Sequence, residues 1–323
     1  SNGFDSRTDK QFGLKTGELK DLKTFDDFYS AVLKQWESLI EMTIDVSLQY
    51  EKYLSFINPS NMYSATIEGA LKKGCDAYQS GVKFNNSAVL NCGFASLVDA
   101  VMAVKEFVYD KKAVTLETLA KALAANWSGF EDLHTQIVKS PHKYGNDDEE
   151  TNRYTEAMSS YFMSKVNNRP NARGGVYKAQ MHSALQFVLQ GKKPGVTPDG
   201  RSAGDEISKN GSPSVGMDRE GVTALIKSAL KARPYTYCES FCLDVMLHPS
   251  AVNGDDGLEI MKSLLFMYMK NGGQSIQFNV FTADTLRDAQ KHPDKYKNLQ
   301  VRVCGWNVRW NNLSKDEQEA YKK

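Results

Sequence analysis

Hydrophobic positions are spaced as on helices through the first half of the chain. Between residues 25 and 56 apolar side chains recur three and four positions apart, which predicts a long helix that Asn58-Pro59-Ser60 ends. Further helices are expected at residues 62–78, 94–109, 115–125, 129–139 and 151–166, and a short buried strand at 84–91. The first half is therefore predicted to be largely helical.

The later part of the chain alternates strand patterns with helical ones. Strands are predicted at residues 241–247, 275–281 and 299–303, and helices at 221–232, 257–271, 282–291 and 314–323. In the second of these strands Ile276, Phe278 and Val280 occupy alternate positions, so they are expected to form its buried face. The alternation of strands and helices predicts an α/β architecture.

Glycine and proline are most frequent between residues 191 and 213, which marks the best candidate domain boundary. At roughly 150 residues per domain, a chain of 323 residues is expected to form about two domains. We place them at residues 1–195 and 196–323.

Composition excludes several classes of protein. The chain has 40 Lys and Arg against 39 Asp and Glu, so it lacks the basic excess of a protein that binds nucleic-acid phosphates. Its best apolar run, residues 264–269, is too short to cross a membrane. The sequence shows no secretory signal pattern, and its five cysteines are odd in number and sparse. We expect a cytoplasmic protein with reduced, buried thiols.

Most standard chemical motifs are absent. Phosphate-binding, dinucleotide-binding, zinc-protease and serine-hydrolase patterns do not occur. The acidic run at residues 147–150 could hold a cation or could be a solvated helix start favoured by the helix dipole. Cys238 and Cys242 could be zinc ligands or two packed thiols.

One segment near the C-terminus stands out, Arg302-Val303-Cys304-Gly305-Trp306. It places Gly305 in a tight turn between two apolar arms. Taken alone, such a glycine is explained by the positive φ of a turn.

Three upstream blocks give this segment a context. They are residues 197–204, 272–280 and 286–296. Together with the Gly305 segment they resemble the pyruvate formate-lyase-like glycyl radical enzymes, and weaker likeness covers most of the chain. The resemblance implies the second half of a ten-stranded α/β barrel wrapped by helices, with a C-terminal glycine-radical loop. Residues 1–195 would belong to the barrel domain and 196–323 would form the glycine radical domain.

The resemblance implies a radical at the Cα of Gly305. In the family an activating enzyme with S-adenosylmethionine and an iron–sulfur cluster installs it, and no cofactor stays bound. A Cα radical is flat, and glycine has no side chain to oppose that geometry. The radical must also be kept away from water and oxygen, and apolar side chains around the glycine favour this. The apolar neighbours could equally be ordinary core residues. They are Val301, Val303, Trp306, Val308 and Trp310.

Two neighbours of the glycine are further candidates. Arg302 is expected to support the loop, or else to be a surface or ion-paired arginine. Cys304 is a candidate catalytic residue, although the family's relay cysteine lies on a separate loop and position 304 resembles a variable small residue. Neither Cys75 nor Cys92 has the surroundings of the family's thiyl cysteine.

The expected function follows from the lack of a cysteine that matches the family's thiyl cysteine. We expect the chain to be the radical-bearing C-terminal portion of a glycyl radical lyase or acyltransferase, of the formate acetyltransferase, dehydratase or decarboxylase type, and to be inactive alone. Expected partners are the activating enzyme, the missing N-terminal half, a small organic substrate and a second copy of the chain. The alternatives are a stand-alone subunit that supplies a radical to a partner enzyme, and an α/β scaffold with a turn glycine.

Overall fold

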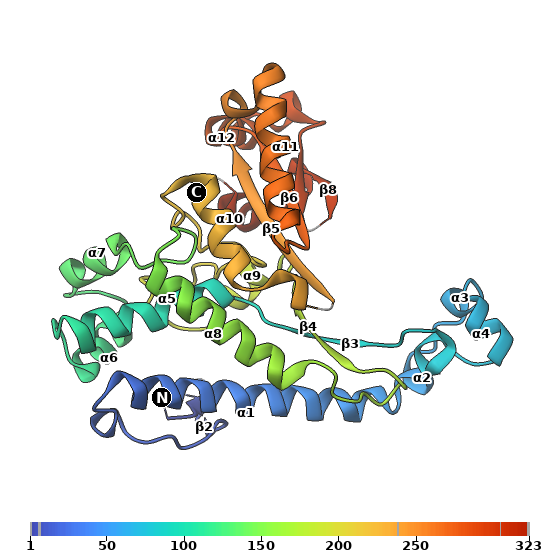
Figure 1. Cartoon of the computed structure of the whole chain (residues 1–323), viewed down its shortest axis with the longest axis horizontal. Helices are drawn as coiled ribbons and strands as arrows, with labels where there is room; N and C mark the ends of the chain where they lie inside the picture. The colour runs from blue at the N-terminus through green and yellow to red at the C-terminus, as the bar shows by residue number, and fades with distance from the viewer. Residues whose placement is uncertain (1, 6–7, 238, 304, 322–323) are drawn as a thin grey trace. The chain divides into compact units, whose positions relative to one another are not determined.

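The computed structural model describes residues 2–5, 8–237, 239–303 and 305–321. The chain forms two compact units, each built from separate stretches of sequence. The first unit comprises Ser1–Leu90, Tyr161–Gln180 and Tyr237–Glu239, and the second comprises Asn91–Ser160, Met181–Thr236 and Ser240–Lys323. Figure 1 traces these stretches by colour. A domain boundary near residue 195 stays a prediction.

The first unit is dominated by the long helix that the sequence predicts. This helix, α1 (Phe25–Glu51), begins at Thr24, whose side chain accepts a hydrogen bond from the Asp27 N–H in a capping box. The remaining elements are short: β1 (Phe4–Asp5), β2 (Lys10–Gln11), α2 (Leu54–Ile57), α3 (Asn61–Ser64), α4 (Glu68–Lys73), β3 (Ser87–Leu90) and β4 (Tyr177–Met181). Strands β3 and β4 pair in parallel, as an α/β fold requires.

The single helix expected at residues 62–78 is wrong. Two short helices, α3 and α4, replace it because Ile67 adopts an extended backbone between them. Gly74 then ends α4 with a φ of +62°, the left-handed conformation that favours glycine. The apolar spacing continues through this break, so spacing alone did not reveal it.

Helix α1 packs against the end of α8 (Glu149–Val166) within the first unit. The Trp36 and Phe162 rings stack with centroids 5.5 Å apart. Beside them the Glu37 carboxylate accepts a hydrogen bond of 2.6 Å from the Tyr161 hydroxyl. Apolar stacking and charge-assisted bonds together hold the long helix in place.

The second unit holds most of the predicted helices and strands. Its helices are α5 (Phe94–Val104), α6 (Leu116–Ala124), α7 (Glu131–Lys139), the first part of α8, α9 (Gln186–Gly191), α10 (Gly221–Lys231), α11 (Gly254–Lys270), α12 (Ala283–Lys291) and α13 (Lys315–Ala320). Its strands are β5 (Ser240–Leu247), β6 (Ser275–Val280), β7 (Gln300–Val303) and β8 (Trp306–Arg309). Each helix and strand predicted beyond residue 221 is present, with ends shifted by a few residues.

Strands β5 and β6 pair in parallel and carry the first core of this unit. Leu243 and Val245 of β5 pack with Leu225 of α10 and with Leu264 and Tyr268 of α11. Ile276 and Phe278 join this core partly buried. The most buried side chains of β6 are instead its alternate polar ones, so the expected apolar face is not the deepest face of the strand.

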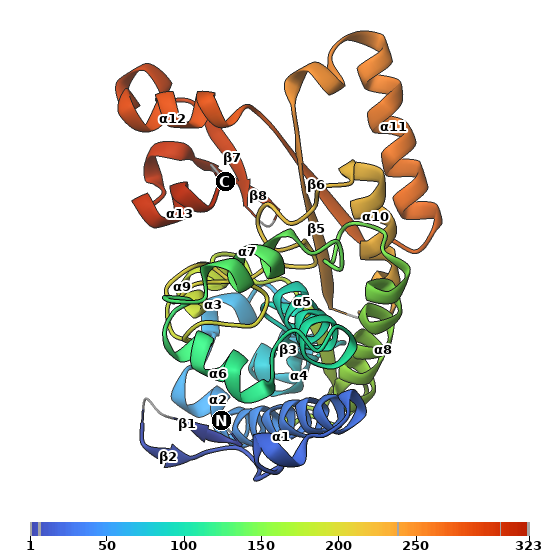
Figure 2. The same ribbon diagram turned by 90° about the vertical axis from the view of Figure 1, so that its left-hand side faces the viewer.

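A second core surrounds the antiparallel pair β7 and β8. Val301 and Val303 of β7 pack with Leu286 of α12 and with Trp310 and Tyr321. In Figure 2, α12 and α13 are both drawn on the same side of this hairpin. The hairpin is thus held by its own small core.

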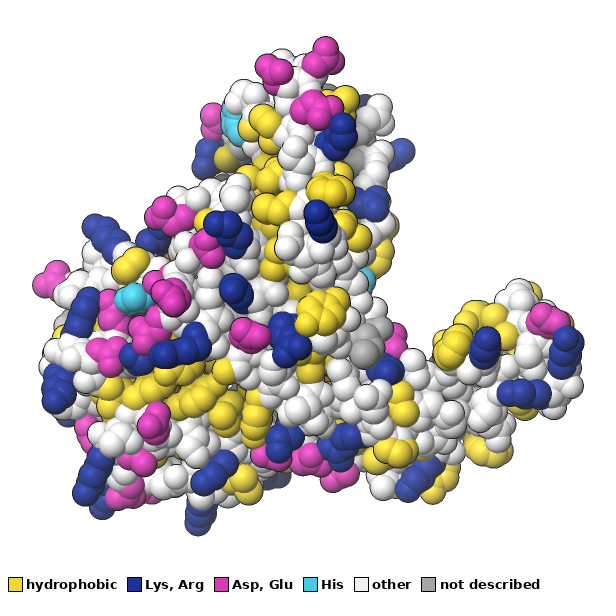
Figure 3. Space-filling view, in the orientation of Figure 1, with side chains coloured by type: hydrophobic (Ala, Val, Ile, Leu, Met, Phe, Trp, Pro, Cys, Tyr) yellow, Lys and Arg dark blue, Asp and Glu magenta, His cyan; other side chains and the backbone are white. Residues whose placement is uncertain are grey.

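Hydrophobic side chains are exposed along α11, where Figure 3 shows them gathered on one face of the molecule. The exposed large apolar residues of this helix are Leu258, Ile260, Leu265, Phe266 and Met269. A contiguous exposed apolar patch is typical of an interaction surface. Among the described residues, every helix is too short or too polar to cross a membrane.

Candidate functional site

Gly305 lies in a two-residue loop at the tip of the β7–β8 hairpin. Val303 pairs with Trp306, so Gly305 lies in the tight turn between the two strands. Gly305 has a φ of +102°, which L side chains rarely adopt. The predicted turn with a positive-φ glycine is confirmed.

The Cα of Gly305 is open on the side where a side chain would stand. Apart from the two chain neighbours of Gly305, no heavy atom of the described residues lies within 4 Å of an ideal Cβ built there. The φ angle, and not crowding, therefore disfavours other residues at this position. The open side leaves room for a reacting group to approach the Cα.

Two buried amides on β6 hold the backbone of the hairpin. The Gln277 Oε1 accepts a hydrogen bond from the Gly305 N–H at 3.1 Å. The Asn279 Oδ1 accepts one from the Arg302 N–H at 2.9 Å, and the Asn279 Nδ2 donates to the Arg302 C=O at 3.3 Å. Neither residue was predicted from the sequence; the signal was a pair of polar residues alternating with the apolar positions of a strand.

Arg302 bonds across the hairpin. Its guanidinium donates to the Asn307 Oδ1 at 3.1 Å, and its backbone C=O also accepts from the Tyr321 hydroxyl at 3.3 Å. Asn307 is the cross-strand neighbour of Arg302 in β8. The first contact joins the two arms of the loop, and the second ties one arm to the residue that follows α13. A role of Arg302 in loop support stays a prediction.

The apolar residues expected to keep the glycine dry divide into two groups. Val301, Val303 and Trp310 are buried and belong to the hairpin core, with Val308 partly buried beside them. Trp306 is 53% exposed, contrary to the expectation of a dry neighbour. Its ring centroid lies 6.5 Å from that of His182.

Of the cysteines, Cys304 and Cys238 lie outside the described residues, so the predictions made for them stand untested. Cys92 lies two residues after the end of β3, and partial burial raises the pKa of its thiol to about 11, against a smaller opposing effect of a hydrogen bond with Ser183. A thiol with so high a pKa stays protonated at neutral pH. Cys75 and Cys92 are partly exposed, contrary to the expectation of buried thiols, whereas Cys242 is buried.

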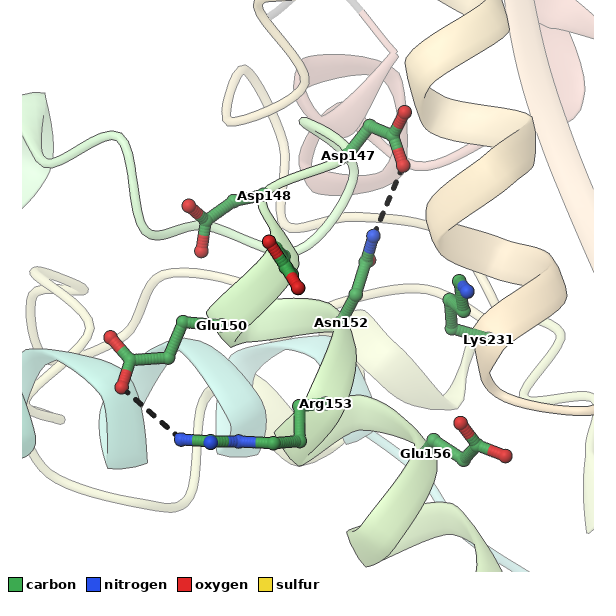
Figure 4. A pocket seen from close by; sticks show the side chains of 8 residues that line it. Asp147, Asp148, Glu150, Asn152, Arg153, Glu156 and Lys231 are labelled. Carbon is green, nitrogen blue, oxygen red and sulfur yellow. Dashed lines mark hydrogen bonds and ion pairs between the residues drawn. The ribbon is translucent and has the colours of Figure 1, made fainter.

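The acidic run at the start of α8 lines a pocket, shown in Figure 4. Three of its carboxylates have partners: Asp147 pairs with Lys227 at 3.1 Å, Glu150 pairs with Lys105 at 2.8 Å, and Asp148 caps the helix. Asp148 accepts a hydrogen bond from the Thr151 N–H at 2.8 Å, as a helix-capping residue does. Across the described ranges, no cluster of three or more His, Cys, Asp or Glu side chains could hold a metal ion, and the helix-start interpretation fits this run.

Comparison with known proteins supplies the context of the hairpin. Residues 1–191 match the family model described as pyruvate formate lyase-like, and residues 207–311 match the one described as glycine radical. Trans-4-hydroxy-L-proline dehydratase of Clostridioides difficile is 32% identical over 319 residues, which cover 99% of this chain and 40% of the dehydratase. Isethionate sulfite-lyase of Bilophila wadsworthia is 30% identical over 324 residues, which cover 96% of this chain and 38% of the lyase.

Solved structures agree in fold. Hydroxyproline dehydratase from Clostridioides difficile, with trans-4-hydroxy-L-proline bound, superposes with a TM-score of 0.93 at 32% identity over 99% of this chain and 41% of the dehydratase chain. The glycerol-bound B12-independent glycerol dehydratase from Clostridium butyricum gives 0.93 at 30% identity, over 99% and 40%.

The structure has two parallel strand pairs together with helices, and its solved relatives share this fold. Both observations confirm the expected α/β fold class. The chain spans about 40% of the length of the relatives it matches. The chain belongs to the pyruvate formate lyase-like glycyl radical enzyme family.

Proposed function

We propose that Gly305 is the residue that stores the radical, and that the chain is the radical-bearing portion of a glycyl radical lyase. One observation carries the assignment: within the region matched as glycine radical, Gly305 lies at the tip of the β7–β8 hairpin with a positive φ and an open Cβ position. An accessible Cα is what removal of a hydrogen atom requires. The buried core behind β7 gives the tip a fixed support.

The proposed activation breaks one Cα–H bond of Gly305. The hydrogen atom, one proton with one electron, passes to the adenosyl radical that a radical S-adenosylmethionine activating enzyme generates, and the unpaired electron stays on the Cα. That electron is shared with the flanking amide nitrogen and carbonyl. The hydrogen bond from the Gly305 N–H to Gln277 holds the nitrogen side of this unit in place.

The proposed reaction is a dehydratase-type elimination on a small organic substrate. Relatives at about 30% identity are named as dehydratases and as a sulfite-lyase, which supports the lyase class over acyl transfer. We propose that the thiyl cysteine comes from the part of the family fold that this chain does not cover. The exposed apolar residues of α11 support a partner that completes the site.

Oxygen offers a direct test, because a backbone Cα radical reacts with oxygen and the chain is cut at that residue. The chain is activated anaerobically with S-adenosylmethionine and its activating enzyme, exposed to air, and analysed by intact mass spectrometry. We expect a cut at Gly305 that Gly305→Ala abolishes. Gly254→Ala removes another positive-φ glycine with an open Cβ position and should leave the cut unchanged. A cut at another residue, or one that persists in Gly305→Ala, would refute the assignment.

A further inference from the structure

Strand β6 presents two amide side chains where a hydrophobic strand face is the norm. Gln277 is 8% exposed and Asn279 is 3% exposed, and they lie two residues apart, on one face of the strand. Asparagine and glutamine are mostly found at protein surfaces. Two of them buried side by side call for a reason beyond packing.

Asn279 bonds to the hairpin as a neighbouring strand would. Its amide accepts from the Arg302 N–H at 2.9 Å and donates to the Arg302 C=O at 3.3 Å. This pair copies the two bonds that a facing residue makes in an antiparallel ladder. A slip of the hairpin by one residue would break both bonds, so Asn279 fixes the register of β7 against β6.

Gln277 makes the matching contact at the tip. The Gly305 N–H is a donor, so the side-chain atom 3.1 Å from it must be the amide oxygen. The Gln277 Nε2 is buried and has no hydrogen-bond partner in the described part of the chain. A half-satisfied buried amide costs stability that an apolar residue of the same shape would not. Packing alone therefore does not explain a glutamine here.

We propose that Gln277 is a positioning residue for the radical glycine, with Asn279 fixing the register that brings the two together. This inference rests on the proposed role of Gly305. A Cα radical gains stability when the amide nitrogen, the Cα and the carbonyl are coplanar and the nitrogen shares its electron pair. An acceptor on the N–H fixes the peptide plane and makes the nitrogen a better electron donor. Gln277 thus stabilises the radical through the neighbouring nitrogen, without touching the Cα.

The first test needs no radical. Selective ¹⁵N-glycine labelling gives signals from the 23 glycines, and the one lost in Gly305→Ala assigns Gly305. In Gln277→Met, which keeps the length and removes the acceptor, we expect exchange of the Gly305 amide hydrogen to be roughly fivefold faster, the ratio that one net hydrogen bond gives. Gln277→Glu keeps an acceptor oxygen and should restore protection. Gln300→Met, an exposed change in β7, is the matched control and should leave exchange unchanged.

The second test uses the activated full chain and electron paramagnetic resonance. In Gln277→Met we expect a radical with a shorter lifetime and an altered coupling to its exchangeable amide proton, both restored in Gln277→Glu. Unchanged amide exchange in Gln277→Met overturns the contact itself. Faster exchange with an unchanged radical lifetime and coupling overturns the positioning role. If the unsubstituted chain yields no radical while exchange responds as expected, the contact stands and the proposed function fails.

Discussion

Asp99 is a fully buried carboxyl in α5 whose ionisation should make stability depend on pH. Its Oδ1 accepts a hydrogen bond from the Tyr144 N–H at 2.7 Å. Burial raises the pKa of this carboxyl from 3.8 to about 7, although the Lys143 charge and the Tyr144 hydrogen bond act in the opposite direction. The loss of hydration is therefore the dominant effect on this group.

The sign and size of the effect follow from proton linkage. The unfolded carboxyl releases its proton near pH 3.8, whereas the folded one keeps it up to about pH 7. Between these values the folded state binds more protons, so the free energy of unfolding falls as pH rises. At about 1.4 kcal/mol per pKa unit, the loss across the window is on the order of 4 kcal/mol.

Asp99→Asn removes the titration and keeps an oxygen that can accept the Tyr144 N–H. We expect the variant to gain stability relative to the parent chain as pH rises from 4 to 7, in urea denaturation followed by tryptophan fluorescence at several pH values. Any change in packing caused by the substitution shifts the unfolding free energy by the same amount at every pH, so it does not alter the shape of the pH profile. Asp132→Asn, an exposed change on α7, is the control. Parallel profiles for Asp99→Asn and the parent chain would refute the reasoning.

Three further changes test the packing around the site and the long helix. Trp310→Ala empties a fully buried position of the hairpin core and should cost about 3–5 kcal/mol of unfolding free energy in urea melts; a cost below ~1 kcal/mol would contradict that core. Ser314→Ala removes the capping box of α13 and should cost about 1 kcal/mol, with Ser314→Asp largely restoring it. Arg169→Ala breaks a half-exposed pair with Glu41, and a double-mutant cycle should give a coupling below about 1 kcal/mol; a larger value would show that the pair is shielded from water.

Local patterns predicted much of the fold, because each helix and strand was read from its own residues. The apolar spacing from residue 25 onward located α1, and the helices expected at residues 282–291 and 314–323 are present as α12 and α13. The break at Ile67 was missed because the apolar spacing runs through it.

Contacts distant in sequence were not visible in this way. The alternation in β6 suggested that Ile276 and Phe278 face the core, and they do pack there partly buried. The deeper face carries Gln277 and Asn279 because a hairpin more than twenty residues later supplies their hydrogen-bond partners. Periodicity shows which residues share a face, but not which element covers it. The same limit explains the wrong expectation for Trp306, because the apolar character of a residue does not show whether its side chain is buried or exposed.

The central claim is that the unpaired electron resides on the Cα of Gly305. Electron paramagnetic resonance of the anaerobically activated chain tests it most directly, in samples made with ordinary glycine and with glycine deuterated at Cα. The account predicts a doublet split by the one hydrogen left on the Cα, its collapse to a single line with deuterated glycine, and no signal from Gly305→Ala. A splitting that survives deuteration, or a signal that survives Gly305→Ala, would contradict it.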